Sequence, residues 1–216
     1  MKKLDRGILI AVEGGEGAGK TTLCKSLVNR LRSNDYDAIY AREPGGIKSA
    51  EDIRSIVVNN DLDYLTQLLL FAAARRININ EIITPALKDK KIIICDRYIL
   101  SSLVYQGIVG NISLSYIQNL MRVIGAYNPD LQILLDVDPV IGYKRSHNIG
   151  REININDNKS LDFHRQINDG YRSLIDNTNY ADYSLTLNVD LSTPTQILNR
   201  VYTNIVYFIN NGKIKK

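Results

Sequence analysis

The chain has 216 residues, of which 44% are hydrophobic and 23% are charged, a composition typical of a soluble globular protein. Its formal net charge of +4 is compatible with an anionic small-molecule ligand and too small to indicate duplex nucleic acid as a partner. No apolar run approaches the roughly 18 to 20 residues that span a bilayer, and residues 8–12 are too few for the core of a signal peptide. The two cysteines lie in apolar patterns outside any CxxC pair, so we expect buried thiols, a reducing cytoplasmic location and no membrane partner.

Short β-rich apolar segments recur along the chain, and longer segments with helical spacing separate them. The expected strands are residues 7–13, 38–42, 91–96, 131–137 and 184–189. The expected helices are residues 20–33, 50–58, 62–88 with a break near 77–80, 114–127, 140–147, 157–177 and 195–210, and Pro139 and Pro194 stand where helices could start. The strands are nearly continuous in Ile, Leu and Val, as expected when helices cover both faces. The sequence therefore predicts one α/β domain, residues 1–216, around a central parallel five-stranded sheet.

The first expected strand runs directly into a glycine-rich turn that opens a helix. Residues 14–22 satisfy the pattern G-x-x-x-x-G-K-[ST]. The backbone N–H groups of such a loop, with the dipole of the following helix, surround a β-phosphate. Lys20 would reach the β- and γ-phosphates, and the Thr21 hydroxyl would bind Mg²⁺. The candidate ATP-binding residues are Gly14, Gly15, Glu16, Gly17, Ala18, Gly19, Lys20, Thr21 and Thr22.

Asp96 and Arg97 stand at the end of the third expected strand. Ligands of open parallel sheets bind at the carboxyl ends of the strands, so both side chains should emerge beside the phosphate loop. A carboxylate there can hold Mg²⁺, directly or through water, and an arginine can clamp a phosphate. Taken alone, the two residues could also form a local ion pair.

Further segments carry a pattern more particular than the phosphate loop. They are Arg-Glu-Pro-Gly-Gly at residues 42–46, Asp-Arg-Tyr at 96–98, Ser-Ser-x-x-Tyr-Gln-Gly at 101–107 and Leu-Asp-Val at 135–137. Together with the phosphate loop and its Glu16, they resemble the bacterial thymidylate kinases over nearly the whole chain. The resemblance implies a P-loop NTPase fold with a short mobile lid at about residues 145–157, and a homodimer. It also implies transfer of the γ-phosphoryl group of ATP to dTMP, giving dTDP, with Mg²⁺ as the cofactor and no nucleic acid polymer as a partner.

The resemblance implies a site for the acceptor nucleotide. Phe71 would stack on the thymine ring, and Arg75, four residues later on the same helical face, would hydrogen-bond the base. Without the resemblance, Phe71 would be read as a core residue, and Arg75 could be a surface charge. The other implied contacts are Ser102 at the base edge, Tyr105 against the sugar where it would exclude a 2′-hydroxyl, Gln106 close by, Glu16 near the acceptor 3′-hydroxyl, and Arg97, Arg42 and Arg54 on the acceptor phosphate.

The implied lid departs from the family pattern. Relatives with an acidic residue in the phosphate loop usually carry several arginines in the lid, whereas residues 146–156 contain a single arginine, Arg151. Arg151 is therefore the leading candidate for a catalytic lid arginine, and Arg145 is the second. The expected catalytic residues are Lys20, Arg97, Arg151 and Glu16.

Other activities are compatible with a phosphate loop. The acceptor oxygen of dTMP is already anionic, so its phosphorylation needs no strong general base. A deoxynucleoside kinase would need a carboxylate base beside the sugar hydroxyl. Comparing the activity on thymidine with the activity on dTMP would separate such an enzyme from a thymidylate kinase. Another nucleotide kinase and a non-catalytic nucleotide-binding module are further alternatives. A switch GTPase would need an Asn-Lys-x-Asp sequence, which is absent.

Overall fold

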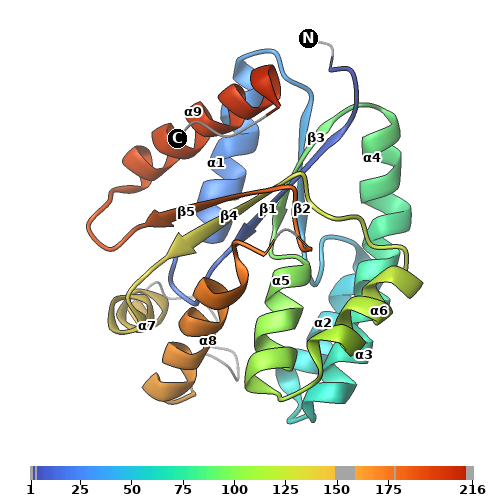
Figure 1. Cartoon of the computed structure of the whole chain (residues 1–216), viewed down its shortest axis with the longest axis vertical. Helices are drawn as coiled ribbons and strands as arrows, with labels where there is room; N and C mark the ends of the chain where they lie inside the picture. The colour runs from blue at the N-terminus through green and yellow to red at the C-terminus, as the bar shows by residue number, and fades with distance from the viewer. Residues whose placement is uncertain (1, 3, 149–158, 178, 213–216) are drawn as a thin grey trace.

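The computed structural model describes residue 2 and residues 4–148, 159–177 and 179–212. Its strands are β1 (Ile8–Glu13), β2 (Ala38–Arg42), β3 (Ile92–Asp96), β4 (Leu131–Asp136) and β5 (Tyr183–Asn188). They pair in parallel in the order β2-β3-β1-β4-β5, with β1 in the middle of the sheet (Figure 1). The expected parallel sheet of five strands is confirmed for the described residues.

The helices lie between the strands in the chain, as the alternation of segments predicts. They are α1 (Lys20–Ser33), α2 (Lys48–Asn59), α3 (Tyr64–Asn78), the π-helical η1 (Ile79–Ile83), α4 (Thr84–Lys88), α5 (Ile99–Ser102), the π-helical η2 (Leu103–Val109), α6 (Leu114–Val123), α7 (Pro139–Asn148), α8 (Leu161–Leu174) and α9 (Pro194–Asn211). Among the described residues, none of these helices has the length and apolar character that crossing a membrane requires.

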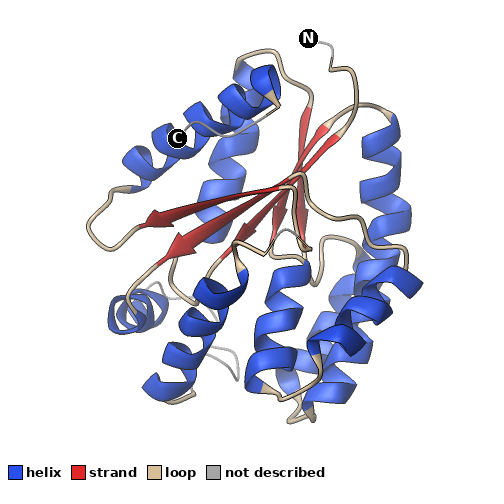
Figure 2. Ribbon diagram, in the orientation of Figure 1, coloured by secondary structure: helices blue, strands red, loops and turns tan. Residues whose placement is uncertain are grey.

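Helices cover both faces of the sheet, as Figure 2 shows. On one face, α1 and α9 pack on the strands through buried side chains such as Leu27 and Val201. On the other face, α3, η1 and η2 do the same through Leu68, Ile83 and Leu103. Each such side chain stabilises the fold by about 1.5 to 3 kcal/mol when it is removed from water. The strands are continuous in apolar residues because both of their faces are buried.

Two expectations about helices are wrong. No break occurs near residues 77–80, because α3 passes through the π-helical turn η1 into α4, and Asn78 and Ile79 keep right-handed helical dihedral angles. Ile79 and Ile83 are buried in the core, and this packing holds the chain helical where a break was expected. The helix formed by α5 and η2 was not expected, since its serines and Gly107 weaken the helical pattern.

Helix ends follow local chemistry. Pro139 and Pro194 are the first residues of α7 and α9, as expected. The expected extension of α6 to residue 127 is wrong, because Gly125 adopts a left-handed conformation with φ of 71°. α8 is shorter than expected: it begins after Ser160, whose side chain accepts the N–H of Phe163, and it ends at residue 174.

Candidate functional site

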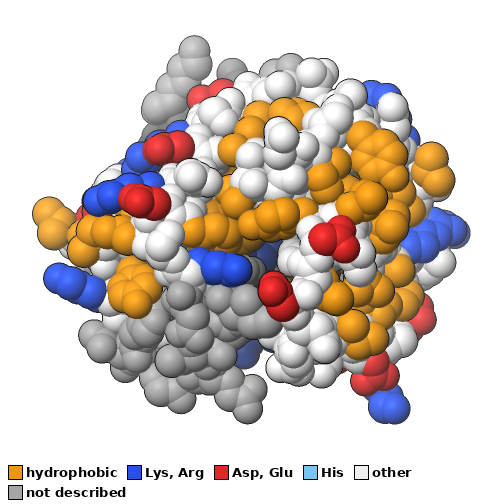
Figure 3. Space-filling model, turned by 90° about the horizontal axis from the view of Figure 1, so that it is seen from below, with side chains coloured by type: hydrophobic (Ala, Val, Ile, Leu, Met, Phe, Trp, Pro, Cys, Tyr) orange, Lys and Arg blue, Asp and Glu red, His pale blue; other side chains and the backbone are white. Residues whose placement is uncertain are grey.

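The carboxyl ends of β1, β2 and β3 meet at one edge of the sheet, where a cavity of about 400 Å³ opens. The phosphate loop, the turn after β2, α3, the turn after β3 and η2 all contribute to its lining. Figure 3 views this end of the molecule and shows acidic and basic side chains beside a central hollow. Segments far apart in the chain converge here because ligand sites of parallel sheets form at this edge.

The phosphate loop, residues 14–19, joins β1 to α1. Gly14, Gly17 and Gly19 have positive φ values of 144°, 69° and 87°, which a side chain would oppose. A Cβ on Gly17 would also lie 2.0 Å from the carbonyl oxygen of Gly142. The backbone therefore requires glycine at these positions, and its N–H groups at the start of α1 form a ready site for a phosphate.

Lys20 begins α1 and reaches back over the loop. Its Nζ donates a hydrogen bond of 2.6 Å to the carbonyl oxygen of Gly15, and the residue is 7% exposed. Burial, together with the positive charge of Arg97, lowers the pKa of Lys20 to about 8, while nearby carboxylates oppose this shift. A bound phosphate would restore the charged form.

Asp96, at the end of β3, lies beside Thr21 of α1. Thr21 Oγ1 donates to Asp96 Oδ2 at 2.5 Å, and the Tyr40 hydroxyl donates to the same oxygen at 3.2 Å. Mg²⁺ prefers oxygen donors and often takes only one or two from the protein, with phosphates and water completing its shell. Among the described residues, no group of three or more His, Cys, Asp or Glu side chains could hold a metal. The Thr21 and Asp96 oxygens lie together and are donors of the kind that Mg²⁺ prefers, so they fit a Mg²⁺ ion that phosphates also hold.

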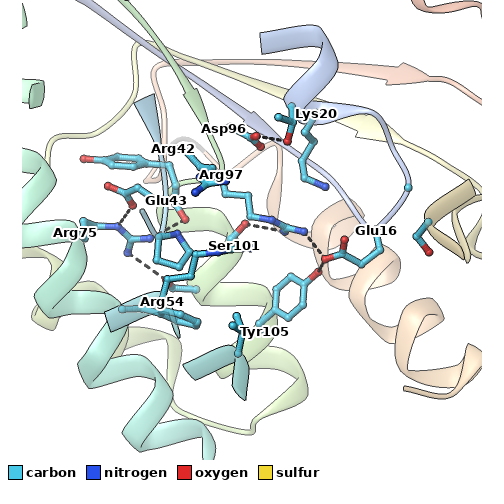
Figure 4. A pocket seen from close by; sticks show the side chains of 18 of the residues that line it. Glu16, Lys20, Arg42, Glu43, Arg54, Arg75, Asp96, Arg97, Ser101 and Tyr105 are labelled. Atoms are coloured by element: carbon cyan, nitrogen blue, oxygen red, sulfur yellow. Dashed lines mark hydrogen bonds and ion pairs between the residues drawn. The ribbon is translucent and has the colours of Figure 1, made fainter. Parts of the chain in front are cut away.

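Arg97 reaches across the cavity from the end of β3 (Figure 4). Its Nη2 donates to Glu16 Oε1 at 2.6 Å, and its Nη1 donates to the Tyr171 hydroxyl at 3.2 Å. The guanidinium carbon lies 5.3 Å from the centre of the Tyr105 ring. Arg97 thus pairs with Glu16 of the phosphate loop and not with Asp96, so the alternative of a local Asp-Arg ion pair is wrong.

Arg42 and Arg54 line the same cavity as Arg97. Arg42 pairs with Glu51 of α2, and Glu51 also accepts the N–H of Gly46 at 2.7 Å, which closes the turn after β2. Burial of the Arg54 guanidinium and the nearby positive charge of Arg42 both lower the pKa of Arg54. The cavity therefore gathers guanidinium groups from three segments, an arrangement suited to a dianionic phosphate.

Arg75 is 4% exposed, so the alternative of a surface charge is wrong. Its Nε donates to Glu43 Oε2 at 2.5 Å, its Nη1 to Ser102 Oγ at 3.1 Å and its Nη2 to the carbonyl oxygen of Tyr98 at 3.0 Å. Glu43 is 3% exposed; burial raises the pKa of its carboxyl, and the charge of Arg75 opposes this. Since the pair is buried and hydrogen-bonded, the guanidinium that lines the cavity is held in one orientation.

The wall of the cavity around Arg75 combines aromatic and amide groups. Phe71 lines the cavity, is partly exposed and lies outside both core clusters, so the core alternative is wrong. Gln106 Nε2 donates to Gln67 Oε1 at 3.4 Å, and Gln67 Nε2 donates to the carbonyl oxygen of Leu62 at 2.7 Å. These bonds orient the Gln106 amide, and no donor among the described residues reaches its Oε1. Tyr105 lies one residue earlier and completes this wall.

The two lid candidates have different outcomes. Arg151 lies outside the described residues, as do residues 149–157 of the expected lid. Arg145, on α7, donates through Nη2 to the carbonyl oxygens of Val189 and Asp190 at 3.2 and 2.8 Å. It lines a second cavity and is not among the residues that line the first.

The second cavity, of about 500 Å³, was not foreseen from the sequence. It shares Gly17, Gly19 and Thr22 with the first, so the phosphate loop separates the two. Most of its other lining residues come from α1, α7 and the start of α9 and include Ile141 and Leu198, and Leu135 of β4 also contributes. Apart from Ala18 and Leu135, these residues belong to none of the motifs above and share only this tertiary neighbourhood.

Comparison with known proteins gives consistent results. A family model described as thymidylate kinase matches residues 12–191. The thymidylate kinase of Clostridium novyi (strain NT) is 41% identical over 178 residues, which cover 80% of this chain and 87% of the relative. The thymidylate kinase of Staphylococcus haemolyticus (strain JCSC1435) is 38% identical over an alignment that covers 93% of this chain and 98% of the relative. The crystal structure of thymidylate kinase from Ehrlichia chaffeensis matches with a TM-score of 0.73, at 27% identity over 94% of this chain and 98% of that one. The motifs, the fold and these similarities agree, and the chain belongs to the thymidylate kinase family.

Proposed function

We propose that this chain transfers the γ-phosphoryl group of ATP to dTMP, giving dTDP and ADP on the way to dTTP. The observation that carries the proposal is that one cavity joins a phosphate loop to a wall with the hydrogen-bonding groups of a thymine site. Arg97 lies between them and contacts Glu16 of the loop. A kinase acting on a monophosphate needs this order of donor phosphates, acceptor phosphate and acceptor base.

ATP would bind across the phosphate loop. Its phosphates would lie against the loop N–H groups and Lys20, and its adenosine would lie in the second cavity, between Ile141 and Leu198. Mg²⁺, held by Thr21 and Asp96 with the phosphates, supplies positive charge that offsets the charge on the transferring group.

The acceptor wall supports dTMP through complementary donors and acceptors. Arg75 is a donor only and suits a pyrimidine carbonyl oxygen, whereas Gln106 presents an acceptor that suits the N3–H of thymine. Cytosine carries an amino group and an unprotonated N3 at these positions, so both contacts would be lost. Phe71 would stack on the base, Ser102 would lie at its edge, and Tyr105 would lie against the sugar.

The chemistry follows from positioning and charge. Arg97, Arg42 and Arg54 would hold the acceptor phosphate in line with the γ-phosphate, and Glu16 would approach the 3′-hydroxyl. The acceptor oxygen is anionic, so no residue needs to remove a proton from it. Arg151 would add charge to the transition state when the lid closes over both nucleotides.

A coupled assay of ADP release with Mg-ATP against a panel of acceptors tests the proposal. We expect turnover with dTMP, and none above background with dCMP, GMP or thymidine. Lys20→Ala is the control for the phosphate loop, and it should lose turnover while it keeps its melting temperature. Turnover of thymidine above that of dTMP would instead indicate a deoxynucleoside kinase, and tight ATP binding without turnover of any acceptor would indicate a binding module.

We also propose that two copies of the chain form a homodimer through α2, α3 and α6. These helices carry large apolar side chains that are 45% exposed or more, namely Ile56, Leu65, Leu69, Tyr116 and Val123. Light scattering of the purified protein should give twice the mass of one chain, and Leu69→Glu should halve it. A monomeric wild type would contradict the proposal.

A further inference from the structure

Glu13, the last residue of β1, is 0% exposed and lies behind the cavity wall without lining it. Its carboxylate accepts two backbone N–H groups at Oε1, from Tyr98 at 2.8 Å and Ser101 at 3.4 Å. Its Oε2 accepts the hydroxyl of Ser101 at 2.6 Å and that of Tyr171 at 3.4 Å. Burial raises the pKa of the Glu13 carboxyl, while the bond from Ser101 and the charge of Arg97 oppose this shift. One buried carboxylate therefore ties together β1, the start of α5 and α8.

The two backbone bonds hold the turn from which Arg97 projects. Arg97 has a φ of 68°, in the left-handed region that costs a residue with a Cβ roughly 1 to 2 kcal/mol. Tyr98, the residue before α5, makes no side-chain cap; Glu13 accepts the N–H of Tyr98 and also that of Ser101, the third residue of α5, which a cap would otherwise bind. The direction in which the Arg97 side chain leaves the backbone thus depends on an acceptor supplied by another strand.

The two hydroxyl bonds determine which groups face Arg97. A hydroxyl has one hydrogen, and an ionised carboxylate can only accept. Because Ser101 gives its hydrogen to Glu13, its oxygen can only accept from its other neighbours, which are the Tyr171 hydroxyl at 2.8 Å and Arg97 Nη1 at 3.4 Å. Tyr171 gives its hydrogen toward Ser101 and Glu13, so its oxygen also accepts from Arg97 Nη1. Glu13 therefore orients both hydroxyl groups as acceptors for one guanidinium.

We infer that Glu13 is a positioning residue for acceptor binding: it sets the turn and the hydroxyl orientation that hold Arg97 for the phosphate of the acceptor nucleotide. The inference rests on the proposed function. Glu13 acts only through its neighbours, because the cavity lining includes Arg97, Tyr98 and Ser101 but not Glu13 itself.

Glu13→Gln tests the inference because the amide has a forced orientation. Its oxygen must face the two backbone N–H groups, so its NH₂ must face the hydroxyl groups of Ser101 and Tyr171. The turn keeps its acceptor. One of the two hydroxyl hydrogens can still lie between Ser101 and Tyr171, and the other is turned toward Arg97. We expect dTMP, titrated without ATP, to bind about tenfold more weakly, as for loss of a hydrogen bond to a charged group. Thymidine, which lacks the phosphate, should bind as it does to the wild type, and the KM for ATP should not change.

Asp130→Asn provides the matched control. Asp130 is also a buried carboxylate bonded to β1, through the N–H of Leu9, but it lies at the opposite end of the strand. The Asp130→Asn substitution should lower the melting temperature without changing dTMP binding. Ser101→Ala removes the hydroxyl group that transmits the effect, should weaken dTMP binding, and should add little to Glu13→Gln in the double variant. This second variant keeps the inference testable if Glu13→Gln does not fold.

The outcomes separate the inference from the proposed function. A wild type that neither binds nor phosphorylates dTMP refutes the proposed function. An active wild type whose Glu13→Gln variant binds dTMP normally, or loses dTMP and thymidine binding equally, overturns the inference and leaves Glu13 a structural residue. Normal dTMP binding by Ser101→Ala would overturn it as well.

Discussion

The lowered pKa of Lys20 predicts that ATP binding depends on pH. In the free protein this pKa is about 8, below the value of 10.5 for an ordinary lysine, because the ammonium group is buried and lies near Arg97. Below pH 8 Lys20 carries the charge that the β- and γ-phosphates need. Above pH 8 it is mostly neutral, and ATP can bind well only if a proton is taken up with it. ATP affinity should therefore fall as the pH rises through 8.

The size of the effect follows from the same pKa. At pH 9, one unit above it, about one tenth of the free protein has a charged Lys20, so ATP should bind about tenfold more weakly than at pH 7, or by about 1.4 kcal/mol. The bound phosphates are largely ionised at pH 7 and fully ionised at pH 9, so they should keep Lys20 charged in the complex. Binding at pH 9 should then take up about 0.9 proton per ATP, against about 0.1 at pH 7.

Calorimetry of ATP binding without dTMP measures this uptake directly. Titrations at each pH in two buffers of different ionisation enthalpy give the number of protons from the difference in heat. Lys20→Met is the control, because its weaker binding should carry no such uptake. The reasoning is refuted if the wild type takes up no more protons at pH 9 than at pH 7, or if Lys20→Met takes up as many as the wild type.

Other substitutions test the remaining roles. Phe71→Ala should raise the KM for dTMP through loss of a stacking contact of roughly 1 to 3 kcal/mol, with little change in the KM for ATP; unfolding of this variant would make Phe71 structural. Asp96→Asn should raise the Mg²⁺ concentration that gives half the maximal rate more than it raises the KM for dTMP, and an unchanged Mg²⁺ titration would argue against a metal role. Arg151→Ala should lower kcat strongly with modest change in either KM, because a lid arginine acts in the transition state. If Arg145→Ala loses kcat while Arg151→Ala does not, the assignment of the lid arginine is wrong.

The sequence alone determined the sheet and the phosphate loop. The five strands were predicted to within one residue at each end, and α1 was predicted at Lys20–Ser33, as observed. Both features are local: a strand buried on both faces must be continuously apolar, and a phosphate loop needs its glycines, Lys and Thr at fixed spacing. For the same reason, the chemistry of Lys20 and Thr21 could be read from their positions in the motif.

The acceptor wall could be predicted only through family resemblance. Nothing in the local pattern distinguishes Arg75 from Arg76 beside it, yet Arg75 is buried on Glu43 and Arg76 is exposed. The break expected at residues 77–80 fails for a similar reason, since the tertiary packing of Ile79 and Ile83 in the core keeps this segment helical.

The tertiary structure decided which groups control the functional side chains. Glu43 and Arg75 are 32 positions apart, Glu13 and Tyr98 are 85 apart, and Glu13 and Tyr171 are 158 apart. The strand order β2-β3-β1-β4-β5 brings the ends of three strands to one edge, and no periodicity or motif encodes that order. The sequence could therefore name the groups that contact phosphates. Their burial, orientation and pKa values depend on partners that become neighbours only when the sheet has formed.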